Sequence, residues 1–189
     1  MNAIELLHNR VSAPVLNSPA PTQTQLEIMF RAALRAPDHA GLQPWRFLTI
    51  EQEARSELGQ LFAKALQAKT SDISEEKLLK AAKKPLRAPM VIIAIASITE
   101  HPKVPEVEQV ITAGCAAHSL LLAAYAQGLG AMWRTGEMAF DPTVKAGLGL
   151  KAHEQVVGFL YVGTAKRMRQ IKALPLEGVY ASWDGINNV

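Results

Sequence analysis

A short polar segment, residues 35–45 with the sequence RAPDHAGLQPW, contains several side chains that could bind a ligand. Arg35 and His39 offer hydrogen-bond donors, and Asp38 and Gln43 offer acceptors. Two prolines and one glycine make a regular helix or strand unfavourable in this segment. It is therefore either a packed connector between a helix and a strand or a binding loop.

The rest of the chain offers few nucleophiles or metal ligands. Cys115 and His118 lie three residues apart on one face of an expected helix, where a thiolate–imidazole pair could form. The alternative, which we favour, is a small apolar thiol beside a hydrogen-bonded core histidine. The segment HEQVV at His153 has Val157 where a zinc-protease motif needs its second histidine, and the sequence contains neither a Walker loop nor a G-x-S-x-G elbow. We therefore expect no metal site and no catalytic side chain, and if the protein is an enzyme its difficult chemistry belongs to a cofactor.

Length and charge narrow the class of protein. The 189 residues fit one domain, and the formal net charge of +3 suits anionic small molecules such as nucleotides. No block of lysines and arginines is present that would follow a nucleic-acid backbone, so we expect no nucleic-acid partner. The single cysteine excludes an internal disulfide, and the first ten residues lack the pattern of a signal peptide. These observations favour a cytoplasmic protein.

Hydrophobic patterning predicts helices and strands around these residues. Thr22 and Gln25 have the spacing of a capping box, and the helix that they begin ends near Arg35, because Pro37 disfavours a helical residue before it. The remaining expected helices are residues 3–9, 53–69, 74–84, about 107–127 and 142–147. The expected strands are residues 46–51, 90–97 and 154–164, with a short strand or extended turn at 131–135. Few strands with long helices between them imply an α+β or α/β sandwich.

Residues 110–133 contain no formally charged side chain and are long enough to cross a bilayer. Their many alanines, three glycines and four polar residues instead favour a central helix that is buried by protein, in part by a second subunit. We therefore expect no membrane partner. Residues 165–189 carry many polar residues without a clear period, which favours a C-terminal arm on a single domain of residues 1–189.

Four segments, in this order, carry a resemblance to a known family. APDHAGLQPWRF at 36–47 resembles the Ala-Pro…Gln-Pro-Trp-x-Phe segment of the nitroreductase family of flavin enzymes. LLHNRVS at 6–12 is similar to the N-terminal Arg-Arg-Ser element of that family. AAHSLLLAAYAQGLGAMWRTG at 116–136 is similar to its long helix and following turn, and VVGFLYVGT at 156–164 to its last core strand. The resemblance spans residues 4–164 and is strongest to the small single-domain NAD(P)H nitroreductases of bacteria.

The resemblance implies both a fold and a cofactor site. The implied fold is α+β, a three-layer α-β-α sandwich with a central mixed sheet and a long central helix, in an intertwined homodimer that holds two FMN molecules at the subunit interface. The implied FMN-binding residues of one subunit are Arg10, Val11, Ser12, Trp133, Arg134 and Thr135. From the partner subunit the resemblance implies Arg35 and His39. The segment that it assigns to NAD(P)H consists of Ala123, Ala124, Tyr125, Ala126, Gln127 and Gly128.

The chemistry of these residues agrees with such a site, because arginine donates in a planar fork to a phosphate or to the carbonyls of a flavin ring. Simpler structural roles remain open for single residues. Arg10 and Arg35 could complement helix ends, Trp45 could belong to the core, and Gln43 could satisfy loop backbone.

The sequence departs from the family pattern at two positions. Val11 stands where a second arginine is usual, and Pro14 stands where another arginine is frequent. Arg169 and Lys172, in the basic segment KRMRQIK, are candidates to supply the missing contact to the FMN phosphate. A solvated basic tail is the alternative, and the sequence favours neither.

We therefore expect an FMN-dependent oxidoreductase, an NAD(P)H nitroreductase. It would pass hydride from NAD(P)H through the flavin to a small-molecule acceptor, a nitroaromatic, a quinone or a similar compound, by a ping-pong mechanism. The alternative is a non-catalytic flavin-binding carrier or sensor.

Overall fold

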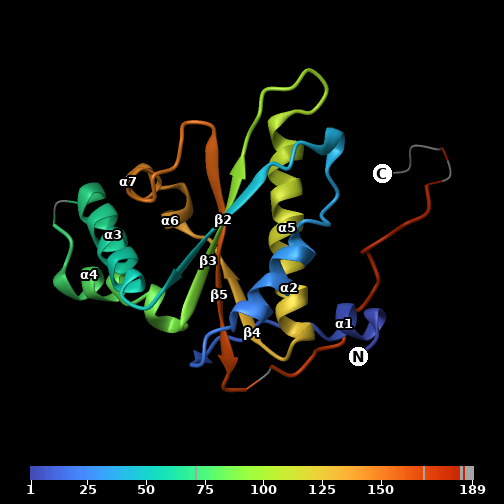
Figure 1. Ribbon diagram of the computed structural model, residues 1–189, viewed down its shortest axis with the longest axis horizontal. Coiled ribbons are helices and arrows are strands. Elements are labelled where there is room, and N and C mark those ends of the chain that lie inside the picture. Colours follow the sequence, from blue (N-terminus) through green and yellow to red (C-terminus); the bar gives the residue numbers. More distant parts are fainter. Residues whose placement is uncertain (71, 168, 184, 186–189) are drawn as a thin grey trace.

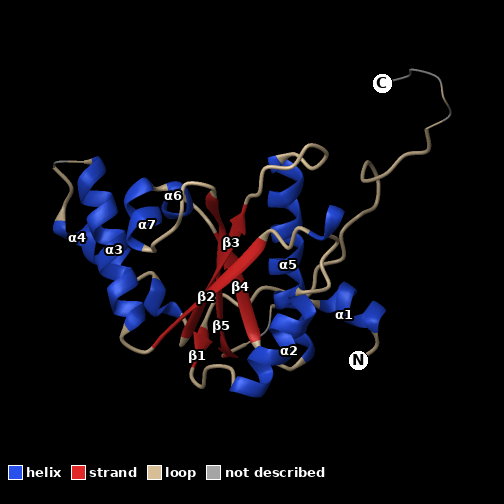
Figure 2. Cartoon of the chain, turned by 45° about the horizontal axis from the view of Figure 1, so that its top comes forward, coloured by secondary structure: helices blue, strands red, loops and turns tan. Residues whose placement is uncertain are grey.

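The computed structural model of the chain describes residues 1–70, 72–167, 169–183 and 185. A five-stranded sheet lies between two layers of helices (Figure 1, Figure 2). One face of the sheet is covered by α2 (Gln23–Ala33) and α5 (Glu106–Ala126). The other face is covered by α3 (Ala54–Lys69), α4 (Glu75–Ala82), α6 (Glu137–Phe140) and α7 (Pro142–Gly147). The three-layer α+β sandwich expected from the sequence is confirmed.

Two long strands form the centre of the sheet, β3 (Met90–Ser97) and β5 (Glu154–Ala165). The remaining strands are β2 (Trp45–Glu51), which pairs with β3, β4 (Gly130–Arg134), which pairs with β5, and β1 (Leu16–Asn17), which pairs with the end of β5. Residues 159–162 of β5 pair with both β3 and β4, so these two strands lie on opposite edges of β5.

Every pairing between the described strands is antiparallel, so the expectation of a mixed sheet was wrong for the chain by itself. The connections explain the difference. The excursion through α3 and α4 leaves the sheet after Glu51 and returns at Met90, and these two residues are paired, so β2 and β3 are joined as in a long hairpin. α5 does connect two strands of the same direction, β3 and β4, but β5 lies between them.

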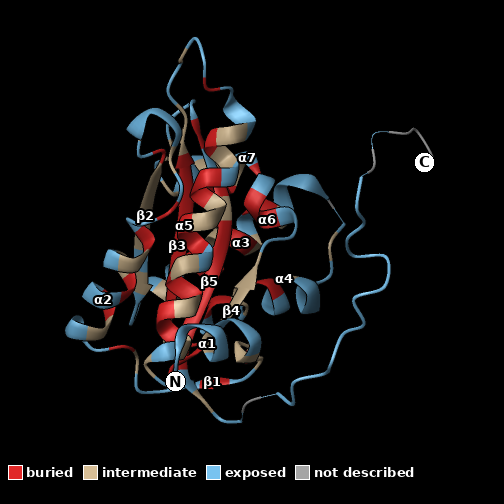
Figure 3. Cartoon of the chain, turned by 90° about the vertical axis from the view of Figure 1, so that its right-hand side faces the viewer, coloured by how far each residue is buried: buried red, intermediate tan, exposed pale blue. Residues whose placement is uncertain are grey.

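The continuous apolar run 90–97 forms a strand that is buried on both faces, as its composition predicted. Even-numbered residues from Met90 to Ala94 face α2 and α5, and odd-numbered residues from Val91 to Ile95 face α3 and α7. Figure 3 shows the buried band that β3 and β5 form together with the facing side of α5. Burial of each large aliphatic side chain contributes about 1.5–3 kcal/mol, so this strand is the main apolar support of the fold.

Capping side chains determine where the first helices begin. The Thr22 hydroxyl accepts a hydrogen bond from the backbone N–H of Gln25 at 3.3 Å, and the Gln25 side chain accepts from the Thr22 N–H at 2.9 Å. The predicted capping box is thus confirmed. Asn2 and Glu5 form a second one at the start of α1 (Ala3–Asn9), which the sequence reading did not identify.

The expected long central helix is α5. Its alanines Ala113, Ala116, Ala117 and Ala124 are fully buried, and such small side chains let the helix approach the sheet and α2 closely. Within the described residues α5 is the one helix that is long and apolar enough to cross a membrane. Half of its most apolar stretch of 18 residues is buried inside the protein. Packing against the sheet and α2 is sufficient to explain its apolar composition.

A buried ion pair ties β2 to the start of β5. The Glu154 carboxylate accepts hydrogen bonds from Nε and Nη2 of Arg46, the latter at 2.9 Å, and from the backbone N–H of Lys151 at 2.8 Å. Its side chain is 3% exposed. The hydrogen bonds from Arg46, with smaller help from the Lys151 N–H and the nearby positive charge, lower the pKa of Glu154 to about 2.

A buried amide holds the loop that precedes α5. The Gln109 side chain accepts a hydrogen bond from the Thr99 N–H at 2.9 Å and donates to the carbonyls of Thr99 and Val104 at 2.7 and 3.2 Å. All the polar atoms of this buried side chain are satisfied, so Gln109 fixes the path of residues 98–105.

After β5 the described residues form no helix or strand and lead away from the body of the protein (Figure 1). Large apolar side chains of this segment are exposed, among them Leu174, Tyr180 and Trp183. The expected arm covers residues 165–189, of which 168, 184 and 186–189 lie outside the described residues.

Candidate functional site

A pocket of about 370 Å³ lies beside β4, on the face of the sheet that α3 and α6 cover. Residues 132–138, which run from β4 into α6, form its wall, and Phe62, Phe159 and Tyr161 give it an aromatic floor. Three of the residues predicted to bind FMN line this pocket: Trp133, Arg134 and Thr135.

The position of Trp133 depends on a glycine of the neighbouring strand. A β-carbon at Gly158 would overlap the indole nitrogen of Trp133. The register between β3 and β5 also shifts between Ala94 and Ile95, which leaves Val157 as the extra residue of a bulge. The glycine and the bulge together make the space in which the indole packs.

The pocket carries a net positive charge. The Arg134 guanidinium lies 5.6 Å from the centre of the Tyr161 ring, within range of a cation–π interaction. Burial raises the pKa of Tyr161, and the charges of Arg134 and Arg87 oppose that rise. Lys84 is a third cation, and Glu137 is the acidic residue among the described residues of the lining. The pocket therefore suits a ligand with anionic or electron-rich groups.

Sequence reasoning missed Lys84 and Arg87 as pocket residues. They lie between α4 and β3, at the two ends of the short 3-10 helix Pro85–Arg87, and are far from β4 in the sequence. The signal that could have found them was the basic segment KKPLR directly before a buried strand.

The N-terminal element lies against the start of β4. The Ala13 N–H donates to the carbonyl of Ala131 at 3.0 Å, which anchors residues 10–12 beside this strand. The pKa of His118 on α5 is lowered, first by burial and then by the positive charge of Arg10, so the Arg10 guanidinium lies near α5. The structure thus places Ala13, which directly follows Arg10, Val11 and Ser12, against the strand that carries Trp133, but these three residues do not line the β4 pocket.

A second basic hollow, of about 480 Å³, lies next to this element. Pro14 lines it together with Arg167, Arg169 and Lys172 from the segment after β5. The two residues named as substitutes for a phosphate contact therefore lie at the position where the family pattern has a further arginine.

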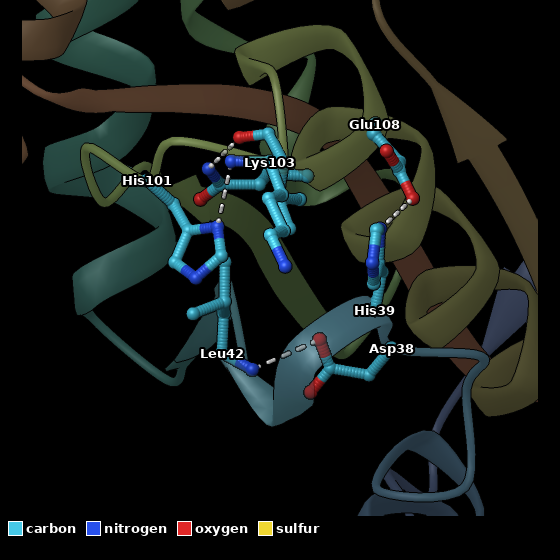
Figure 4. A network of polar contacts seen from close by, with 8 residues as sticks. Asp38, His39, Leu42, His101, Lys103 and Glu108 are labelled. Atoms are coloured by element: carbon cyan, nitrogen blue, oxygen red, sulfur yellow. Dashed lines mark hydrogen bonds and ion pairs between the residues drawn. The ribbon is translucent and has the colours of Figure 1, made fainter.

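The polar loop before β2 lies at the N-terminal end of α5 (Figure 4). Nδ1 of His39 is 2.8 Å from the carboxylate of Glu108, in the first turn of α5. The Asp38 carboxylate accepts hydrogen bonds from the backbone N–H groups of Leu42 and Gln43 at 3.1 and 2.8 Å. These contacts give the loop a defined shape.

The backbone of this loop is strained. Ala40 and Gln43 have φ values of 63° and 49°, and Gly41 between them has 65°. The left-handed region costs a non-glycine residue roughly 1–2 kcal/mol, so the hydrogen bonds of Asp38 must hold a conformation that the chain would not adopt alone. Such strain concentrates at ligand-binding segments, which favours the binding-loop interpretation over a plain connector.

Arg35 and His39 do not line the β4 pocket of their own chain. His39 instead contacts Glu108 in the first turn of α5. Their expected approach from a partner subunit stays a prediction.

The segment assigned to NAD(P)H has a structural role in this chain. Ala123 and Ala124 are buried in the core. Gln127 donates to the carbonyls of Gln25 and Ala123 at 3.3 and 3.1 Å, which ties α5 to α2. Gly128, with φ 76°, ends the helix in the left-handed conformation that favours glycine. The other four residues of the segment keep exposed surface: Tyr125, Ala126, Gln127 and Gly128.

The structural alternatives fit the other singled-out residues. Trp45 and Cys115 are half-buried and pack against the core cluster of α2 and α5. Among the described residues no hydrogen bond joins the Cys115 thiol to His118, and no group of three His, Cys, Asp or Glu side chains is arranged to hold a metal ion.

Residues 13–164 match the family model described as the nitroreductase family. The chain is 43% identical over 164 residues to YdjA of Escherichia coli K12, which carries the name of an NAD(P)H nitroreductase, and the match covers 87% of this chain and 88% of YdjA. A Haemophilus influenzae protein with the same kind of name is 40% identical over 165 residues, with 87% and 89% covered.

Solved structures share the fold. A nitroreductase-like protein from Bacillus cereus superposes with a TM-score of 0.83 at 21% identity and covers 98% of this chain and 97% of its own. A nitroreductase from Desulfovibrio desulfuricans in complex with FMN has a TM-score of 0.71 at 21% identity, with 97% and 98% covered.

Proposed function

The chain belongs to the nitroreductase family, and from this premise we propose that it is an FMN-dependent oxidoreductase. It passes hydride from NAD(P)H through the flavin to a nitroaromatic, a quinone or a similar small acceptor. The observation that carries the proposal is the positively charged, aromatic-floored pocket beside β4, whose wall contains Trp133, Arg134 and Thr135.

The residues present fit FMN. A flavin ring is flat and apolar, with carbonyl acceptors at its edge, and the pocket offers aromatic surface from Phe159 and Tyr161 with the donor fork of Arg134 beside them. Arg10 and Ser12, next to β4, can donate to the phosphate. Arg169 and Lys172 complete this phosphate site across Pro14, where the family pattern has an arginine.

The second half of the site comes from a partner subunit in this proposal. Arg35 and His39 do not line the pocket of their own chain, and in this proposal they complete the site of the other chain. α5 exposes Val107 and Ile111 on one side, and the arm exposes Trp183 and its neighbours. Apolar surface of this kind marks an interface, which supports an intertwined homodimer.

The chain's own residues position the flavin and stabilise its reduced state. FMN, when bound, supplies the chemistry by taking hydride from the reduced nicotinamide and giving it to the acceptor. Arg134 stabilises the negative charge of the reduced state as a preorganised donor. The strained loop with His39 orients the ring, and solvent supplies the proton. Donor and acceptor use the same pocket in turn, which gives ping-pong kinetics.

The test is the visible absorption of the purified protein under anaerobic conditions, before and after NADPH and then NADH. We expect the two bands of an oxidised flavin, bleached by at least one nucleotide, and parallel double-reciprocal plots with a nitroaromatic acceptor. A flavin spectrum that neither nucleotide bleaches would favour a carrier or sensor. A colourless protein that takes up no FMN would refute the proposal.

A further inference from the structure

A third hollow, of about 340 Å³, lies between the C-terminal part of α3 and α4, outside the site described above. Its apolar surface comes from Leu66, Ile73 and Ala81. Its polar lining includes three lysines from α4 and the residues that follow it: Lys77, Lys80 and Lys84. The hollow thus combines apolar contact area with several ammonium groups.

The lysines lie on one face of the helix, because their spacing of three and four residues corresponds to successive turns. Asp72 is the acidic residue among the described residues of the lining, so the hollow has an excess of two positive charges. None of the three lysines forms an ion pair with another described residue. Their charges are therefore available to a ligand.

Lys84 joins this hollow to the proposed flavin pocket. Its side chain lines both, and Arg87, one turn further on, lines the flavin pocket together with Arg134. A continuous basic wall thus leads from the reacting centre to Lys77 and Lys80. A ligand that reacts in the flavin pocket can extend along this wall.

We propose that the α3–α4 hollow is an anion-binding subsite for the reacting ligand. It takes a phosphate or carboxylate group attached to a flat apolar group. Lysine binds phosphate and carboxylate as a mobile point charge, and Leu66, Ile73 and Ala81 offer contact to an aromatic ring. The anion is either the 2′-phosphate of NADPH beside its adenine or the carboxylate of an aromatic acceptor. The inference rests on the proposed function, and it places nucleotide recognition away from the buried residues Ala123 and Ala124.

The test uses the full chain with Lys77→Gln and Lys80→Gln combined. Lys64→Gln with Lys83→Gln is the matched control, because it removes the same charge from α3 and from the residue that follows α4, and neither side chain lines the hollow. Calorimetric titration with adenosine 2′,5′-bisphosphate reports the nucleotide arm, with 5′-AMP as reference. Titration with 4-nitrobenzoate reports the acceptor arm, with nitrobenzene as reference.

We expect the double variant to weaken the anionic ligand of one arm about tenfold relative to its reference, which corresponds to about 1.4 kcal/mol. The control keeps wild-type affinity. A loss in the bisphosphate arm identifies the nucleotide, accompanied by an equal rise in the ratio of the KM values for NADPH and NADH, and a loss in the nitrobenzoate arm identifies the acceptor. Wild-type affinities in both arms, or equal losses in the control, would overturn the proposal. Binding is measured without turnover, so this failure is distinct from a flavin that no nucleotide reduces.

Discussion

Replacing Glu154 by glutamine should destabilise the protein in a manner that depends on pH. The carboxylate has its pKa lowered from 4.5 to about 2, chiefly by the hydrogen bonds from Arg46. Each tenfold change in proton affinity is worth about 1.4 kcal/mol, so this difference corresponds to about 3.4 kcal/mol as an upper value. The Arg46 side chain is 35% exposed, and because solvent screens such a partner we expect about 2 kcal/mol in practice.

The sign follows from the direction of the pKa change. Because the folded state lowers the pKa, the stabilisation is complete above the unfolded value of 4.5 and is lost as the pH falls toward the folded value of about 2. For a chain of this length about 2 kcal/mol corresponds to a melting temperature lower by roughly 4–8 °C at pH 7. Most of the difference from the wild type should be gone at pH 3.

Urea and thermal unfolding of the wild type and the Glu154→Gln variant at pH 7, 5 and 3 measure this effect. Glu27→Gln, an exposed carboxylate on α2, is the matched control and should leave stability within experimental error at each pH. A difference between wild type and Glu154→Gln that has the same size at pH 3 as at pH 7 would show that the lost interaction is packing rather than charge.

Three further changes test the site and its supports. Gly158→Ala should displace the indole of Trp133, lower the unfolding free energy by about 1–3 kcal/mol and lower the flavin content per chain. Gly114→Ala is the control, because a β-carbon there makes only an ordinary contact of 3.9 Å with the same indole. Equal effects at both glycines would contradict the packing described. Arg169→Gln combined with Lys172→Gln should raise the Kd for FMN about tenfold in fluorescence titrations. The Kd for riboflavin, which lacks the phosphate, should stay unchanged. Equal losses of affinity for FMN and riboflavin would exclude a phosphate contact. Gln109→Ala should lower the unfolding free energy by about 2–3 kcal/mol, because buried backbone groups lose their partners. It should also speed proteolysis within residues 98–105. Wild-type cleavage rates would show that the loop holds its path without this side chain.

The local elements could be predicted from the amino-acid sequence. The Thr22–Gln25 box, the proline stop after Arg35 and the apolar run 90–97 each depend on groups within one short segment, whose geometry is the same wherever the segment lies. The order of four family segments also identified the family before any coordinates.

Contacts between distant segments could not be predicted and follow from the folded arrangement. Lys84 and Arg87 come to β4 because β3, which follows them, and β4 flank the same residues of β5. The burial of Ala123 and Ala124, the space for an indole over Gly158 and the antiparallel sheet arise in the same way, from strand pairing and helix packing. Such contacts join residues far apart in the chain, and no periodicity or spacing along the sequence encodes which strand becomes the neighbour of which.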